Sequence, residues 1–132
     1  MFTTDHAFPG FSVDVIDAAR RFYGETLGMT VADGDMGFLG LEFASGGRVL
    51  IYDKPNHEPA SYTILNFPVR DLSAAVDELN ARGVNTKIYS DDEFPTDSRG
   101  IVHATDNGPD IAWFKDPAGN VLAVFQDDDL PG

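Results

Sequence analysis

The sequence predicts an α+β fold in which one strand–helix–strand unit occurs twice. The first observation is internal similarity: Phe11–Val31 can be laid on Phe67–Lys87 with apolar residues meeting apolar residues. The second is periodicity: each copy starts with an alternating apolar run and continues with apolar residues at helical spacing. The third is size: 132 residues, 42% of them hydrophobic, are enough for one domain with a core.

The first copy opens with a predicted strand and a predicted helix. Asp14 or Asp17 is expected to cap the helix by accepting a backbone N–H. Gly28 stands where a left-handed residue would end it. The residues of the strand pattern and of the helical stripe are Phe11, Val13 and Val15, then Ile16, Ala19, Tyr23 and Leu27.

The second copy repeats this arrangement with a clearer helix. Asp71 is the expected N-cap, and Gly83 the expected C-terminal residue in the left-handed conformation. The residues of its strand pattern and helical stripe are Leu65, Phe67 and Val69, then Leu72, Ala75, Val76 and Leu79.

Further strands are predicted after each helix, separated by turns rich in Gly, Pro and Asn. We divide the chain into module one (about 1–56), a linker with two prolines (about 54–61), module two (about 62–126) and an acidic tail (127–132). The strands expected are Thr30–Ala32, Phe38–Ala44, Arg48–Asp53, Thr86–Ser90, Gly100–Thr105, Ile111–Lys115 and Val121–Gln126, with turns at Ser45–Gly47, Asn107–Gly108 and Pro117–Asn120.

The amino-acid composition argues against some classes of binding partner. The formal net charge of −13 would repel a phosphate backbone, so we expect no nucleic-acid partner. The simpler interpretation of this charge is a solvated surface, and the alternative is a field that attracts a cationic ligand. No apolar stretch reaches the ~20 residues of a membrane span, the first residues do not form a signal-peptide pattern, and cysteine is absent. We therefore expect a cytoplasmic protein with no membrane partner.

Three strings of the sequence carry a resemblance to a known superfamily. They are the strand–helix segment Val13–Met29 with its Phe-Tyr and Leu-Gly pairs, the matching segment Val69–Val84, and the turn Phe114–Val121 with Asp-Pro-x-Gly-Asn. Together they resemble the glyoxalase / bleomycin-resistance / dioxygenase (vicinal oxygen chelate) superfamily. The resemblance implies two βαβββ modules that form curled mixed sheets around a shared cleft, and a homodimer.

Enzymes of this superfamily hold one divalent metal at four inward-facing strand positions, filled by His or Glu. By their offset from the matched strings, these positions fall on Phe8, Tyr52, Ile64 and Ala123. Phe, Ile and Ala cannot ligate a metal through the side chain, and one Tyr does not make a site. We therefore expect no metal, no cofactor and no catalytic residue.

Other chemistries are less well supported. A displaced metal site could combine His6 and His103 with Glu42 or Asp53, but no spacing supports that group. The simpler interpretation is that His6 and His57 are solvated and His103 is a hydrogen-bonded strand residue. Neither a Gly-x-Ser-x-Gly string nor a phosphate-binding glycine loop is present.

Apolar residues at the four positions predict an apolar, aromatic cleft suited to a small organic ligand. We expect a metal-free small-molecule-binding protein that sequesters a cationic or aromatic antibiotic, with Trp113 stacking on the ligand. The alternatives are a divalent-metal-dependent lyase, isomerase or dioxygenase with displaced ligands, and an interaction module with a closed cleft. Each candidate ligand-binding residue could instead pack in the hydrophobic core, and we prefer this interpretation for Phe38 and Tyr89. The candidate ligand-binding residues are Phe8, Phe38, Tyr52, Ile64, Tyr89, His103, Trp113 and Ala123.

Overall fold

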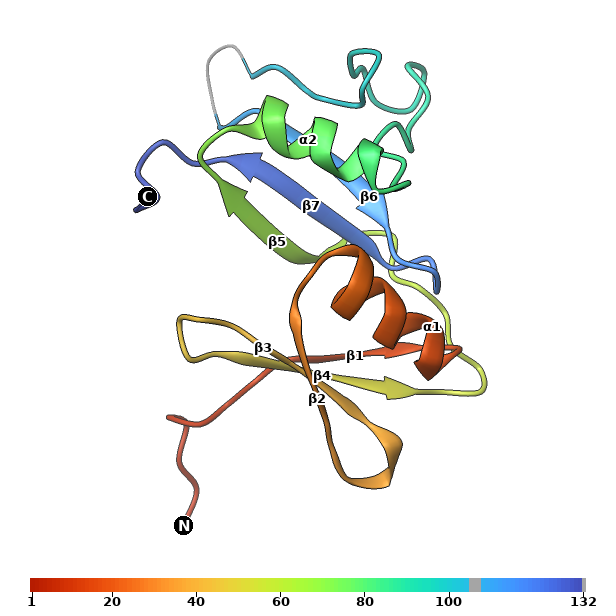
Figure 1. Ribbon diagram of the computed structural model, residues 1–132, viewed down its shortest axis with the longest axis vertical. Coiled ribbons are helices and arrows are strands. Elements are labelled where there is room, and N and C mark those ends of the chain that lie inside the picture. The colour runs from red at the N-terminus through yellow and green to blue at the C-terminus, as the bar shows by residue number, and fades with distance from the viewer. Residues whose placement is uncertain (105–107, 132) are drawn as a thin grey trace. The chain divides into compact units, whose positions relative to one another are not determined.

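The computed structural model describes residues 1–104 and 108–131. The chain divides into unit 1 (Met1–Pro59) and unit 2 (Ala60–Gly132). Each unit contains one mixed β-sheet with a helix packed on it (Figure 1). The predicted α+β class, with two mixed sheets and few helices, is confirmed.

Unit 1 is a four-stranded sheet with the strand order β1-β4-β3-β2. Strands β1 and β4 are parallel, and the other neighbours are antiparallel. One face is buried against the helix, through Val13, Ala19, Tyr23, Leu39, Leu41, Val49 and Ile51. The elements are β1 (Gly10–Val13), α1 (Ile16–Arg20), the π-helix η1 (Arg21–Thr26), β2 (Thr30–Asp33), the 3-10 helix η2 (Asp35–Gly37), β3 (Leu39–Glu42) and β4 (Arg48–Asp53).

The start of the unit 1 helix differs from the prediction. Neither Asp14 nor Asp17 caps it; the N-cap is Val15, which has no side-chain acceptor and is 53% exposed instead of continuing the strand. The Asp14 carboxylate accepts the N–H of the adjacent Val15 at 2.9 Å, so it is oriented outside the helix. The helix ends as predicted at Gly28, where φ is 74°.

The described residues of unit 2 form a three-stranded sheet with the order β5-β7-β6, in which β5 is parallel and β6 antiparallel to β7. Its helix follows the prediction at both ends. The Asp71 carboxylate accepts the Ala74 N–H at 3.0 Å, and Gly83 has φ 86°. The elements are β5 (Thr63–Val69), α2 (Leu72–Ala81), β6 (Ile111–Lys115) and β7 (Val121–Gln126). The core residues are Leu72, Val76, Val84, Ile101, Ala112, Phe114, Leu122 and Val124.

The turn between β6 and β7 is built by one buried carboxylate. Asp116 accepts the N–H of Ala118 at 3.0 Å and that of Asn120 at 2.9 Å. The Asn120 amide donates to the second Asp116 oxygen at 3.0 Å. This network explains physically why the Asp-Pro-Ala-Gly-Asn string marks a turn at this place.

The predicted strand Thr86–Ser90 is wrong. The Lys87 N–H donates to the Asn85 side chain at 3.0 Å, and the Asn85 amide donates to the Lys87 carbonyl at 3.3 Å. The buried Thr86 hydroxyl donates to the Arg99 carbonyl at 2.6 Å. Side chains therefore occupy backbone groups that a β-ladder would need.

The predicted strand Gly100–Thr105 is also wrong over the residues that the structure describes. Only Val102 pairs with the sheet, through an isolated bridge to Ile111. The Asp97 carboxylate accepts the Ile101 N–H at 3.0 Å, and the Asp110 carboxylate accepts the Ala104 N–H at 2.8 Å. Thr105, and Asn107 of the predicted turn Asn107–Gly108, lie outside the described residues.

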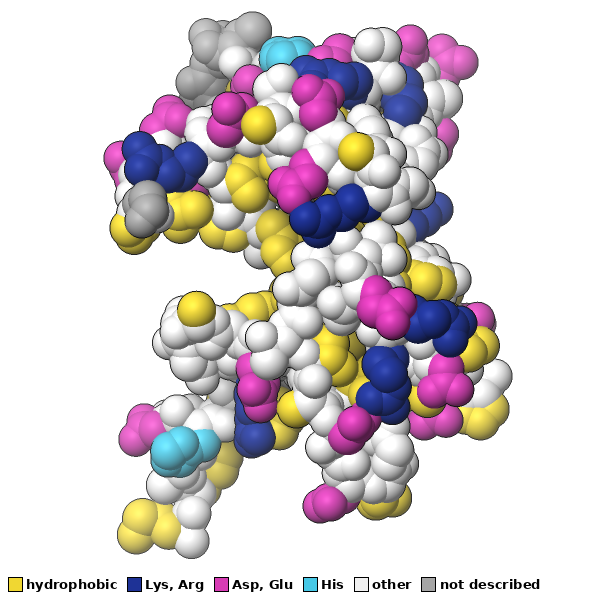
Figure 2. All heavy atoms as spheres, in the orientation of Figure 1, with side chains coloured by type: hydrophobic (Ala, Val, Ile, Leu, Met, Phe, Trp, Pro, Cys, Tyr) yellow, Lys and Arg dark blue, Asp and Glu magenta, His cyan; other side chains and the backbone are white. Residues whose placement is uncertain are grey.

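Acidic side chains are spread over both units on the face seen in Figure 2, with basic side chains among them. Two exposed ion pairs of unit 2 are typical: Arg99 with Asp77 and Lys87 with Asp91, both at 2.7 Å. This distribution favours the interpretation of the charge as a solvated surface. Within residues 1–104 and 108–131, no helix has the length and apolar character needed to cross a membrane.

Candidate functional site

The face of the unit 1 sheet that points away from α1 carries the first candidate site. Its floor is a row of cross-strand neighbours, in the order Gly10, Leu50, Gly40 and Ala32. A Cβ added to Gly40 would meet no atom within 4 Å, so the space above this residue is open. The small residues Gly40 and Ala32 therefore make the sheet face hollow on the β3–β2 side of this row.

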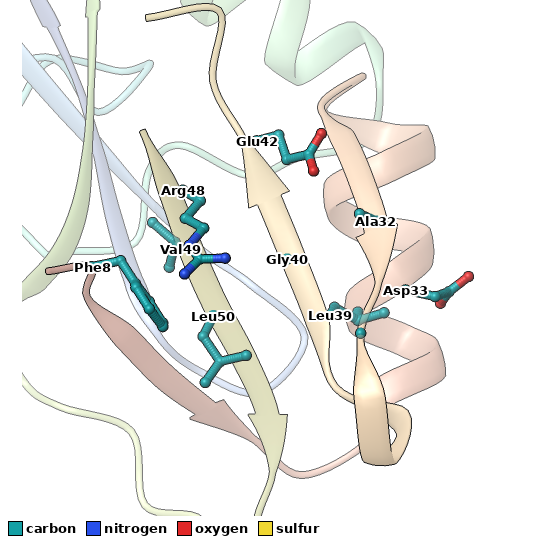
Figure 3. Close-up of a pocket in the computed structure, with 10 residues that line it drawn as sticks. Phe8, Ala32, Asp33, Leu39, Gly40, Glu42, Arg48, Val49 and Leu50 are labelled. Carbon is teal, nitrogen blue, oxygen red and sulfur yellow. The ribbon is translucent and has the colours of Figure 1, made fainter. Parts of the chain in front are cut away.

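A pocket of about 270 Å³ lies on this floor (Figure 3). Phe8, predicted from the sequence, lines it and is 44% exposed. The Arg48 guanidinium lies 4.0 Å from the centre of the Phe8 ring, a cation–π contact. The lining residues are Phe8, Ala32, Asp33, Gly34, Leu39, Gly40, Glu42, Arg48, Val49 and Leu50.

Two more predicted residues, Phe38 and Tyr52, lie together in unit 1, with ring centres 6.1 Å apart. Tyr52 is the register partner of Ser12, whose hydroxyl lies 2.6 Å from Nδ1 of His57. The expectation that His57 is merely solvated is therefore wrong, because a half-buried hydrogen bond holds its ring.

The second candidate site is an aromatic cluster in unit 2. Trp113 lies 5.5 Å from Tyr89 and 5.0 Å from Phe94, measured between ring centres. Trp113 alternates along β6 with the buried Ala112 and Phe114, so it faces away from the core of unit 2. Phe94 is 40% exposed, which leaves part of the cluster open to a ligand.

The remaining β-strand candidates of unit 2 lie beside this cluster in the sheet register. Ala123 is the register partner of Trp113 and is wholly buried. Ile64 lies at an irregularity of β5, where the register shifts between Thr63 and Leu65. As a result Asn66, not Ile64, is paired with Ala123 on β7.

His103 lies on a loop between two carboxylates. Its Nε2 is 2.8 Å from Asp97 and its Nδ1 is 3.4 Å from Asp110. The hydrogen bond to Asp97 raises the pKa of His103. Burial opposes ionisation of Asp97, but hydrogen bonds from Ile101, His103 and Arg99 outweigh it and lower its pKa to about 2. This geometry gives His103 a role in holding the loop.

The four positions expected for a metal do not fit one. Phe8, Ile64 and Ala123 have no donor atom in their side chains, and the Tyr52 ring packs on Phe38. Within the described parts of the chain, no group of three or more His, Asp or Glu side chains is arranged to hold a metal ion.

Sequence reasoning missed several residues of these surfaces. Arg48, Gly40 and Glu42 could have been found, because the alternation that places Tyr52 on one face of a strand places Arg48 there too. Phe94 lies outside every strand and helix, so no periodicity indicated it. Asn66 was hidden by the irregularity in β5, since an offset count assumes a regular strand.

Comparison with solved structures finds the same fold at low sequence identity. A putative glyoxalase family protein from Bacillus anthracis is 20% identical, with a TM-score of 0.68, over 96% of this chain and 99% of that chain. A glyoxalase/bleomycin resistance protein from Streptomyces sp. CB03234 is 26% identical, with a TM-score of 0.58, over 91% and 100%. A bleomycin-binding protein in complex with bleomycin is 25% identical, with a TM-score of 0.64, over 94% and 99%.

A comparison with curated proteins gave no match. The sequence model of the Glyoxalase/Bleomycin resistance protein/Dioxygenase superfamily matches residues 4–124, which is most of the 132-residue chain. The match includes all three strings that carried the resemblance, the whole unit 1 sheet and the unit 2 sheet as far as Val124 of β7. The chain therefore belongs to the Glyoxalase/Bleomycin resistance protein/Dioxygenase superfamily.

Proposed function

We propose that this chain is a metal-free small-molecule-binding protein that sequesters its ligand and does not transform it. The observation that carries the proposal is the set of side chains at the four positions that the resemblance assigns to a metal, Phe8, Tyr52, Ile64 and Ala123. Because only Tyr52 among them has a donor atom, these positions offer mainly apolar and aromatic contact surface, which suits binding of an organic molecule.

The ligand we propose is aromatic or cationic, and of the antibiotic type. The open aromatic cluster of Trp113, Tyr89 and Phe94 gives a flat group several ring faces to contact. Although the acidic side chains are spread over the surface, their net charge of −13 would still attract a ligand with a positive group. One structural neighbour is a bleomycin-binding protein complexed with bleomycin, which makes bleomycin a reasonable first probe.

We also propose that the 132 residues form one functional domain, that the protein is a cytoplasmic homodimer, and that the eight predicted residues contribute to binding. Of these, Phe8 in the unit 1 pocket and Trp113 in the unit 2 cluster are the best placed, since both are partly exposed. Light scattering of the purified protein tests the dimer.

The test of this function is calorimetric titration with metal-free bleomycin. If Trp113 stacks on the ligand, Trp113→Ala should weaken binding by about 1–3 kcal/mol, and Trp113→Phe, which keeps a ring, by less. Tyr62→Ala is the matched control, because Tyr62 is an exposed aromatic residue outside the cluster. Unchanged affinity in Trp113→Ala would remove Trp113 from the site.

The same samples decide between binding and catalysis. Because Trp113 is the only tryptophan, its fluorescence reports ligand contact without interference from another site. No quenching and no heat with bleomycin, or with a panel of other aromatic cationic drugs, would contradict the proposal. Turnover that depends on an added divalent metal would replace it with a lyase, isomerase or dioxygenase.

A further inference from the structure

The unit 1 pocket contains two opposite charges that do not neutralise one another. Glu42 and Arg48 are directly opposite on β3 and β4, a placement in which such residues usually attract each other. In Figure 3 the Arg48 side chain extends toward Phe8, and Glu42 extends away from it, toward β2. Among the ion pairs between described residues, none includes Arg48 or Glu42.

Arg48 remains able to bind an anion in this position. A cation–π contact with Phe8 uses the face of the ring and consumes none of the five guanidinium N–H donors. These donors form a planar fork that matches the two oxygens of a carboxylate. The pocket therefore holds a carboxylate-binding group that its aromatic neighbour keeps in place.

The pocket floor beside the two charges, two residues along β3 from Glu42, is apolar and open. Gly40 and Ala32 are cross-strand partners there, and a side chain at Gly40 would find free space. Glu42, which extends toward β2, can accept the N–H groups of an ammonium. An apolar body lying on this floor would have an anion-binding group on β4 and a cation-binding group on β3 beside it.

We propose that the unit 1 pocket binds a dipolar ligand, with a carboxylate on Arg48, an ammonium on Glu42 and a flat apolar body over Gly40 and Ala32. This inference rests on the proposed binding function and names the chemical class of the ligand at this pocket. A ligand with both charges also explains why the pocket of an acidic protein, for which we propose a cationic ligand, contains an arginine.

Three probes of one size test this charge preference. They are 4-(aminomethyl)benzoate, which has both charges, 4-methylbenzoate, which has only the anion, and 4-methylbenzylamine, which has only the cation. Affinities are measured from the chemical-shift change of the Gly40 amide in titrations of the full chain. We expect the dipolar probe to bind up to about fivefold more tightly than either singly charged probe, the size of one exposed ion pair.

Single-residue variants identify which side chain binds the carboxylate of the probe and which binds its ammonium group. Arg48→Met should lower the affinity of the dipolar probe to that of 4-methylbenzylamine, and Glu42→Gln should lower it to that of 4-methylbenzoate. Gly40→Val fills the floor and should abolish the shifts that all three probes cause at the amide of its cross-strand partner Ala32. Arg21→Met and Glu25→Gln are the matched controls, since both residues are exposed on η1 and outside the pocket, and they should change nothing.

Equal binding of the three probes would overturn the inference, as would the absence of any Gly40 shift up to the solubility limit of the probes. The proposed function fails by different results, namely no drug binding or a metal-dependent turnover. Drug binding with no probe selectivity would leave the proposed function standing and remove only the dipolar ligand.

Discussion

Units 1 and 2 start from the same strand–helix pattern but complete their sheets differently. In unit 1 the strands after the helix form as predicted, and the sheet has four strands. In unit 2 the described residues between α2 and β6 form loops held by side chains, and the sheet formed by the described residues has three strands. The difference shows that nearby polar side chains can take the hydrogen bonds of a segment's backbone. The segment then forms a loop and does not join the sheet.

The two units also differ in the surfaces they offer a ligand. Unit 1 has a hollow floor at Gly40 with the charged groups of Arg48 and Glu42 around it. Unit 2 presents aromatic rings, and one of them, Phe94, comes from a loop and not from the sheet. The loops that replace strands in unit 2 thus supply part of its candidate site.

The largest effect is expected where the unit 2 loop packs tightly on itself. A Cβ at Gly100 would overlap the Thr86 carbonyl, and φ there is 89°. Gly100→Ala should therefore destabilise the protein by about 3–5 kcal/mol through overlap and backbone strain together. Gly37→Ala in unit 1 is the control, because φ is 80° but the space is open, and it should cost only about 1–2 kcal/mol.

Urea denaturation measures both variants. Equal losses of stability would mean that the close packing of Gly100 on Thr86 does not hold the loop, and the contrast between the units would lose its main support.

A smaller effect is expected at the carboxylate that organises the same loop. Asp97 accepts the N–H groups of Arg99 at 2.8 Å and Ile101 at 3.0 Å. Asp97→Ala leaves these donors without their acceptor and should cost about 2–3 kcal/mol. Asp33→Ala in unit 1 removes only an exposed ion pair with Arg20 and should cost less than about 1 kcal/mol. A loss in Asp33→Ala as large as that in Asp97→Ala would contradict this difference.

The smallest effect is a pH dependence confined to unit 2. Because the folded protein raises the pKa of His103, the stability this residue contributes is complete below the unfolded pKa of about 6.5 and is lost as pH rises through the folded pKa. Because the pKa of Asp97 is lowered to about 2, its contribution is present above about pH 3.9 and is lost as pH falls toward 2.

Urea midpoints at pH 5.5 and 8.5 test the histidine contribution. The unmodified protein should be less stable at pH 8.5 than at pH 5.5, and His103→Gln should remove part of that difference. His6→Gln is the control, since His6 is exposed in the N-terminal segment. A difference that persists unchanged in His103→Gln would exclude this residue as its source.

The sequence predicted the elements whose signals are local. Alternation placed Arg48–Asp53, Ile111–Lys115 and Val121–Gln126 correctly, and Asp71 and Gly83 marked both ends of α2. Each of these depends on neighbours a few residues apart, which a sequence shows directly.

What could not be predicted depends on partners distant in sequence or on local irregularity. The Thr86 hydroxyl binds a carbonyl 13 residues away, and Phe94 joins Trp113 from a loop. The shift in β5 moved Asn66 into line with Ala123, and no composition signal marks such a shift. The contributions of the predicted site residues to binding stay predictions, to be tested by the variants proposed above.

The central claim is that the side chains at the four positions predicted to correspond to the superfamily's metal ligands do not together bind an ion. Elemental analysis of protein purified without chelators, after growth in medium supplemented with Mn, Fe, Ni and Zn, tests it most directly. The account predicts far less than one equivalent of any divalent metal per chain, before and after dialysis against the same ions. One tightly held ion per chain would contradict it and make an enzyme the better description.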